Sequence, residues 1–230
     1  MDGFKSAKEA FEFVKTNHPE LQAIWDGMKA NPEERRKENR ERIGVDWRKG
    51  SDISSAEFAS KFGSRGVEFG NWVNAQERQN SVNEAYDAFM DLSGVTGISP
   101  NALSLNGELG FAFGARGSGK FNAHYEPGKV VINLTKTRGA GSLAHEWWHA
   151  IDNYFSRARG IKDSYLTDNP RQRRAPDGSP DNSIRIEMIE AFKGIISAID
   201  HSKLRQRSLV LDRTRSEAYW STTIEMAARC

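Results

Sequence analysis

Apolar side chains recur every three or four residues in several parts of the chain, a spacing that places them on one face of a helix. The clearest case is segment 74–92, in which Val82, Ala85 and Phe89 form one stripe. Gly94 follows this segment and is expected to end the helix in a left-handed conformation. Similar spacing or capping signals predict further helices at 6–15, 31–42, 54–62, 140–156, 184–199 and 216–230.

Three short runs of aromatic and β-branched residues lie near the middle of the chain and are typical of strands. They span 109–113, 121–125 and 130–134 and are separated by glycine-containing turns, so we expect antiparallel neighbours. Strands grouped between helical segments predict an α+β fold with a small mixed or antiparallel sheet. We expect an exposed loop at 168–183, which is rich in Pro, Arg, Asp and Gly.

The composition fits one folded domain, residues 44–230, preceded by a helical extension, residues 1–43. The 230 residues are 37% hydrophobic and carry a net charge of +2 with both signs mixed, which disfavours nucleic acid as a partner. The chain contains neither a run of ~18 to 20 apolar residues nor a basic-then-apolar leader, so we expect no membrane partner and a cytoplasmic location. Cys230 is the single cysteine, which excludes an internal disulfide and a thiolate metal cluster.

Gly114–Lys120 has the glycine and lysine spacing of a phosphate-binding loop. Such a loop continues with a Ser or Thr that binds Mg²⁺, and then with a helix whose N-terminus holds the anion. Phe121 stands at that position, and the residues around it predict a strand. We therefore interpret the segment as a glycine-rich hairpin turn and expect no nucleotide site.

His145-Glu146-Trp147-Trp148-His149 is an HExxH pattern within a predicted helix. At about 100° per residue, the two histidines lie within roughly 40° of each other and one turn apart, so they can present two imidazole nitrogens to one metal ion. Glu146 lies about 100° around the helix. This position suits a base that takes a proton from water at the metal. Trp147 is expected to point into the core, and Trp148 to form a wall beside the site.

A carboxylate from a later helix is expected to complete the ligand set. A third nearby histidine is excluded, because that pattern needs Gly and His where the sequence has Asp152 and Phe155. Glu225 is favoured because it lies in an otherwise apolar stretch with two alanines beside it. The weaker alternatives are Glu217, Glu187 and Glu190.

Asp152 lies on the same helical face as both histidines, about 20° from His145. We expect its carboxylate to accept a hydrogen bond from a ligand imidazole and so to orient that ring. The alternative is a solvated aspartate near the helix end.

Several stretches around these residues match a known pattern: 65–73, 83–92, 110–120, 124–135 and 142–155, the last of which contains HEWWH. Over roughly residues 44–230 the sequence resembles the type-one large polyvalent protein-associated domain of conjugative elements and phages. The resemblance implies a zincin-like fold of the gluzincin type with a metallopeptidase-type site. It also implies His145 and His149 as ligands, Glu146 as base and Glu225 as third ligand.

The expected activity is that of a zinc-dependent peptidase acting on a protein or peptide, in the service of a mobile genetic element or phage. In this hypothesis Zn²⁺ activates a water, Glu146 accepts its proton, and the hydroxide attacks the peptide carbonyl. Strand 130–134 is expected to be the sheet edge that pairs with an extended substrate. Side chains expected to stabilise the oxyanion are Tyr154, Tyr219, His124 or His201.

Two alternative functions are also consistent with this sequence. In a catalytically inactive module, zinc stabilises a fold that binds a partner protein, and Glu146 is dispensable. A nucleic-acid accessory role would rest on the basic run 171–174, which is more typical of a solvated loop.

Overall fold

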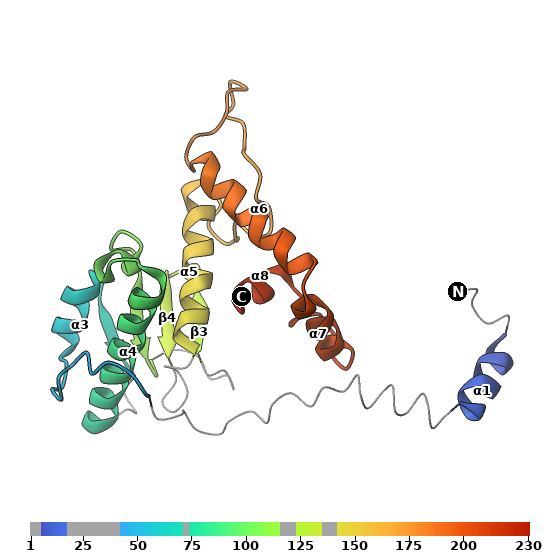
Figure 1. Cartoon of the computed structure of the whole chain (residues 1–230). Helices are drawn as coiled ribbons and strands as arrows, with labels where there is room; N and C mark the ends of the chain where they lie inside the picture. The colour runs from blue at the N-terminus through green and yellow to red at the C-terminus, as the bar shows by residue number, and fades with distance from the viewer. Residues whose placement is uncertain (1–5, 18–41, 71–73, 116–122, 135–141) are drawn as a thin grey trace.

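The computed structural model describes residues 6–17, 42–70, 74–115, 123–134 and 142–230. The described helices are α1 (Ala7–Thr16), α3 (Ser55–Phe62), α4 (Ala75–Thr96), α5 (Leu143–Ala158), α6 (Ile186–Asp200), α7 (Lys203–Asp212) and α8 (Thr223–Ala227), with a 3₁₀-helix at Pro100–Ser104. Together with a small mixed sheet they form an α+β fold, as the sequence predicts (Figure 1). None of the described helices combines the length and the apolar character that crossing a membrane requires.

Most of the predicted helix 31–42 and of the glycine-rich segment 114–120 lies outside the described residues. Among the described segments, α1 confirms the predicted helix 6–15, and the side chain of Ser6 accepts the backbone N–H of Glu9 at its start. Helices α3, α5 and α6 likewise confirm the helices expected in their regions.

The sheet contains four strands in the order β1-β2-β4-β3. They are β1 (Val67–Phe69), β2 (Gly110–Phe113), β3 (Ala123–Glu126) and β4 (Val131–Leu134). β2 pairs in parallel with β1 and with β4, whereas β3 pairs antiparallel with β4. The antiparallel expectation is therefore confirmed for β3 and β4 and wrong for β2. The reason is the order of the strands, in which β4 and not β3 is the neighbour of β2. The chain reverses between β2 and β3 and again between β3 and β4, so β2 and β4 run in the same direction.

β3, and not β4, is an edge of the sheet, so the expectation that 130–134 forms the edge is wrong. β4 is buried along its whole length, as interior strands are, while β3 alternates between buried and half-buried positions. The sequence did contain a signal that 131–134 is an interior strand, the apolar residues Val131, Ile132 and Leu134. A nearly continuous apolar run is typical of a strand covered on both faces.

Helix α4 begins and ends at capping residues. The side chain of Asn74 accepts the N–H of Glu77, and the Glu77 carboxylate accepts the N–H of Asn74. The helix ends at Gly97, which has φ 70°, and continues through Gly94, where its end was expected. Either glycine can adopt the left-handed conformation, and a glycine inside a helix costs only about 1 kcal/mol, so the pattern alone did not decide between them.

Phenylalanine rings from α3, α4 and β2 form the centre of the main core. The ring of Phe58 lies 5.2 Å from that of Phe111 and 6.2 Å from that of Phe89, and these side chains are at most 2% exposed. Helix α5 packs against β3, β4 and α4 beside this cluster (Figure 1). The core therefore fixes the helix that carries the HExxH motif relative to the sheet.

The single helix predicted at 216–230 is wrong. Helix α7 forms earlier, and α8 has only five residues. Asp212 explains the break, because its carboxylate accepts the backbone N–H groups of residues 219–221 at 2.7 to 3.1 Å. Those amides bond to a side chain in place of a helical carbonyl, and the helix starts only after Thr222, whose side chain caps it.

Segment 168–183 is an exposed loop, as predicted. Arg173 donates a hydrogen bond to the carbonyl of Arg159 at 2.6 Å, and Arg174 donates to that of Gly178 at 2.8 Å. Arg174 thus holds the backbone of its own loop and Arg173 ties the loop to the end of α5, which agrees with the solvated-loop interpretation.

Replacing Asp212 with Ala is expected to speed hydrogen exchange at residues 219–221 by about tenfold or more, since a hydrogen bond to a charged group contributes about 1.5–3 kcal/mol. Exchange in β2 and β4 should not change. Hydrogen exchange read by mass spectrometry checks this, with Asp200→Ala as a matched control whose carboxylate pairs with Arg205 at the surface. Unchanged exchange at 219–221 in the Asp212 variant would contradict the explanation.

Candidate metal centre

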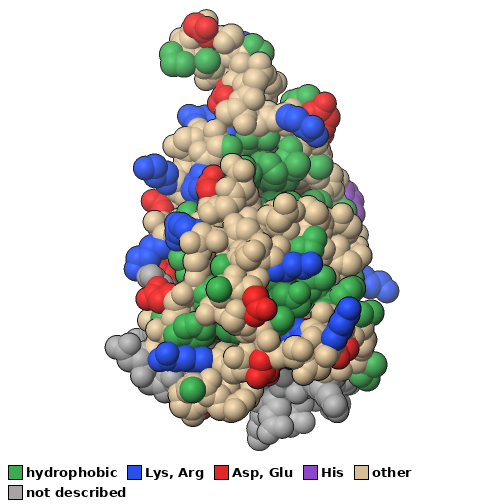
Figure 2. Space-filling model, turned by 90° about the vertical axis from the view of Figure 1, so that its left-hand side faces the viewer, with side chains coloured by type: hydrophobic (Ala, Val, Ile, Leu, Met, Phe, Trp, Pro, Cys, Tyr) green, Lys and Arg blue, Asp and Glu red, His purple; other side chains and the backbone are tan. Residues whose placement is uncertain are grey.

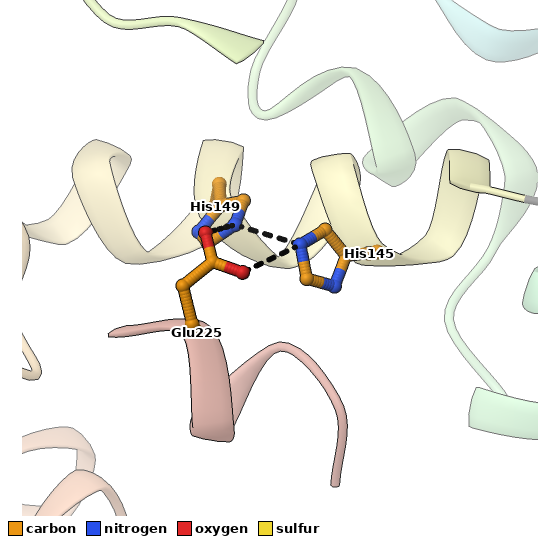
Figure 3. Close-up of side chains that lie close together, drawn as sticks. All are labelled: His145, His149 and Glu225. Carbon is orange, nitrogen blue, oxygen red and sulfur yellow. Dashed lines mark hydrogen bonds and ion pairs between the residues drawn. The ribbon is translucent and has the colours of Figure 1, made fainter. Parts of the chain in front are cut away.

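Helix α5 presents His145 and His149 on one face, one turn apart, as the spacing predicts. Their Nε2 atoms lie 3.1 Å apart, and their ring planes are nearly perpendicular at 87°. His149 is 6% exposed and His145 is half-buried. The two nitrogens therefore converge on one point beside α5 (Figure 3).

Glu225 reaches both histidines from α8, and Figure 3 shows its carboxylate directed toward the two imidazoles. Its Oε2 lies 3.4 Å from Nε2 of His145, and its Oε1 lies 3.5 Å from Nε2 of His149. The structure thus brings the favoured carboxylate to the motif. The alternatives are exposed and outside this group of donors: Glu217, Glu187 and Glu190.

The donor atoms lie at separations that suit one metal ion. The two Nε2 atoms are 3.1 Å apart, and the nitrogens of His145 and His149 lie 3.4 and 3.5 Å from different oxygens of the Glu225 carboxylate. In a tetrahedral site with metal–ligand distances of about 2.0–2.1 Å, neighbouring donors lie about 3.3 Å apart. Two imidazoles and one carboxylate fit such an ion and leave its fourth position open. His145, His149 and Glu225 therefore form a potential metal-binding triad.

Glu146 lies beside the triad and is 7% exposed. Burial raises its pKa; the two nearby histidines and the backbone N–H of Tyr125 oppose this effect, and the net shift is upward. A raised pKa suits a carboxylate that accepts and releases a proton near neutral pH. The interaction with Tyr125 also shows that Glu146 lies next to the edge strand β3.

Contacts on two sides hold Glu225 in place. Met226 and Ala227 are buried in a cluster against which Trp148 packs, and Arg229 donates a hydrogen bond to Oε2 of Glu225 at 2.6 Å. Burial alone would raise the pKa of Glu225, but the interactions with the two imidazoles outweigh it, and the net pKa lies well below the usual range. The carboxylate is therefore ionised, which is the form that binds metal ions.

The two tryptophans of the motif pack on different sides of α5. Trp147 is 5% exposed and donates to the carbonyl of Leu103 at 2.8 Å, so it points into the main core as predicted. Trp148 stacks on Phe192 of α6, with ring centroids 5.7 Å apart, and also packs against the cluster that contains Met226 of α8. Trp148 therefore joins α5 to the C-terminal helices.

Asp152 is fully buried, so the alternative of a solvated aspartate is wrong. Its carboxylate accepts the N–H of Thr167 at 2.9 Å and the hydroxyl of Thr167 at 2.5 Å. Burial raises the pKa of Asp152 to about 6, against the opposing effect of these hydrogen bonds. Among the described residues, Nδ1 of His149 has no hydrogen-bond partner. The expected hydrogen bond from the His149 imidazole to Asp152 is therefore wrong: Asp152 bonds to Thr167, and His149 acts on it only through its charge.

Of the side chains expected to stabilise the oxyanion, Tyr219 contacts the triad. Burial, the charge of Glu225 and a hydrogen bond to that carboxylate raise the pKa of Tyr219. The others lie against different neighbours, Phe155 for Tyr154, Glu126 for His124 and the Ser197 carbonyl for His201.

Two neighbours of the triad were missed by sequence reasoning. The ring of Tyr165 lies 5.8 Å from that of His149, and burial raises its pKa. Tyr165 follows α5 in a loop, where no spacing relates it to the motif. Arg229 lies four residues after Glu225, and that helical spacing of opposite charges was an available signal.

Comparison with known proteins gives one finding. Residues 1–61 match the family model of large polyvalent protein-associated domain 5. This supports the expected relation to large polyvalent protein-associated domains, with a different domain number and a different range from the resemblance at 44–230. The matched residues end within α3, before the sheet and the triad. No curated protein and no solved structure matches the chain.

Asp152→Asn is expected to alter how stability depends on pH. Because the pKa of Asp152 is about 6 in the folded protein and 3.8 ordinarily, the folded state keeps a proton that the unfolded chain has lost between these values. Wild-type stability from this group therefore falls as the pH rises from about 4 to about 6. Asn can bond to both Thr167 groups without titrating, so wild type should lose roughly 2–3 kcal/mol relative to the variant over this interval.

Urea unfolding of both proteins in EDTA, at several pH values across the interval, measures this difference. Parallel pH profiles for the two proteins would show that Asp152 titrates normally.

Proposed function

We propose that the protein is a zinc-dependent peptidase that hydrolyses peptide bonds in a protein or peptide substrate. The observation that carries this proposal is the triangle of donors from His145, His149 and Glu225, with buried Glu146 beside it. Two histidines with a carboxylate from a later helix are a ligand set of zinc peptidases. The mixed sheet with α5 packed on it further supports a zincin-like fold of the gluzincin type.

His145, His149 and Glu225 would hold a Zn²⁺ ion, and when bound it would supply a water of lowered pKa and polarise the substrate carbonyl. Glu146 accepts the proton of the attacking water. Its raised pKa lets it keep that proton and then transfer it to the leaving amine. The lowered pKa of Glu225 keeps the third ligand ionised throughout.

Tyr165 and Tyr219 supply two phenol groups near the triad. Both pKa values are raised, chiefly by burial, so both hydroxyls are protonated at neutral pH. A protonated phenol can donate a hydrogen bond to the negative oxygen that develops on the carbonyl during attack.

The edge strand β3 suits an extended peptide substrate. Among the described strands it pairs only with β4, and strand addition joins an extended peptide to an edge strand of this kind. The interaction between the N–H of Tyr125 and Glu146 means that a peptide lying along β3 would run beside the proposed base. We also propose that the protein acts for a mobile genetic element or phage, a context to which the family match at 1–61 points. The cytoplasm is the proposed place of action.

Protein purified without a histidine tag is expected to carry about one zinc ion per chain. His149→Ala and Glu225→Ala should each lose it, because each removes a ligand. Glu217→Ala is the matched control, since it makes the same change at an exposed glutamate shortly before α8. Elemental analysis measures the content, and zinc retained in both ligand variants would refute the ligand set.

Glu146→Gln is expected to keep the zinc and to slow hydrolysis by about 10²–10⁴-fold, the usual contribution of a general base. A degenerate peptide library read by mass spectrometry gives the rates. Cleavage at the wild-type rate would remove Glu146 from the mechanism. A zinc-loaded wild type that cleaves no peptide, with partner binding that survives Glu146→Gln, would favour the zinc-stabilised protein-binding module.

A further inference from the structure

Arg229 is held between the third ligand and the segment that leads into α8. Its Nη2 donates to Oε2 of Glu225 at 2.6 Å, and its Nη1 donates to the carbonyl of Trp220 at 3.4 Å. The guanidinium also lies 4.3 Å from the ring centroid of Trp220 and 5.4 Å from that of Tyr219. The side chain is therefore fixed by a carboxylate, a carbonyl and two aromatic rings.

Apart from the bond to Arg229, few contacts in α8 orient the carboxylate of Glu225. A five-residue helix has little stability of its own. The cap from Thr222 to the N–H of Glu225 is long at 3.4 Å, and the buried contacts of α8 come from Met226 and Ala227. These contacts locate the helix, whereas the bond from Arg229 acts on the carboxylate itself.

We propose that Arg229 is a positioning residue that holds the Glu225 carboxylate in its metal-binding orientation and thereby raises the affinity for the metal ion. This inference rests on the proposed function. Arg229 bonds to Oε2, which also lies 3.4 Å from Nε2 of His145, and leaves Oε1, 3.5 Å from Nε2 of His149, free of the guanidinium. A metal ion bound there would meet a carboxylate that is already oriented. Groups that orient a ligand in this way typically change metal affinity by about 10–100-fold.

The positive charge of Arg229 opposes this effect, because it repels a metal cation. The guanidinium side chain is 21% exposed, so solvent and salt screen that repulsion only in part. The hydrogen bond to Glu225, in contrast, is direct and short, as bonds between charged groups are. The proposal therefore requires that the gain from orientation exceed this repulsion, and the zinc affinity of Arg229→Gln measures which is larger.

Arg215 provides a matched comparison within the same segment. Its guanidinium lies 5.1 Å from the ring centroid of Tyr219, the residue before Trp220, and 3.8 Å from Asp212. Among the described residues it forms no ion pair with Glu225. A substitution at Arg215 removes an arginine that stacks on the same aromatic pair, and it spares the bond to the third ligand.

The test is the affinity of purified wild type, Arg229→Gln, Arg229→Lys and Arg215→Gln for Zn²⁺, measured by competition with a chromophoric chelator. Arg229→Gln should bind zinc about tenfold more weakly or worse, and Arg215→Gln should stay within about twofold of wild type. Arg229→Lys keeps the charge but cannot bridge Glu225 and Trp220, so its affinity should lie between the two. The visible absorption of bound Co²⁺ should change in Arg229→Gln and remain as in wild type in Arg215→Gln.

Circular dichroism and thermal unfolding in EDTA establish which variants fold. If Arg229→Gln does not fold, the zinc affinity of Arg229→Lys is compared with that of wild type instead. Wild type that binds zinc, with equal or tighter binding in the folded Arg229 variants, would overturn the role of Arg229 and leave the proposed function standing. Wild type that binds no zinc would overturn both.

Discussion

The packing of Trp148 against the C-terminal helices is the contact on which the site depends. The triad draws two residues from α5 and one from α8, and these helices are far apart in the sequence. Trp148 projects from the same helix as the histidines and packs against Phe192 and the cluster that contains Met226. The residue next to His149 thus anchors the helix that carries Glu225. Because the spacing of these side chains depends on how α5 and α8 pack together, this contact is what brings Glu225 to the two histidines.

Glu146 and Glu225 illustrate how similar burial leads to opposite chemistry. Both carboxylates are largely withdrawn from water, which by itself raises a carboxyl pKa. Interactions with the two imidazoles lower the pKa of Glu225, so it remains an anion suited to bind a cation. At Glu146 the interactions that lower the pKa are too weak to offset burial, so its pKa rises and it is suited to carry a proton. Opposed shifts in neighbouring carboxyls are the arrangement that separates a ligand from a base.

The sequence predicts the local parts of this structure well. Helical spacing locates α4 and α5, and the HExxH pattern together with an isolated acid in an apolar stretch indicates the three donors. The rest depends on tertiary contacts. The order of the strands follows from where the β3–β4 hairpin lies against β2, and the break before α8 follows from the bonds of Asp212 to residues 219–221. Tyr165 approaches His149 only because its loop folds back over α5, and no local pattern encodes that approach.

The most direct test of the account is a crystal structure of the zinc-loaded protein with anomalous data collected at the zinc edge. The account predicts one strong anomalous peak within about 2.0–2.2 Å of Nε2 of His145, Nε2 of His149 and an oxygen of Glu225. A peak bound by other residues, or a triad that stays without a peak when zinc is supplied, would contradict it.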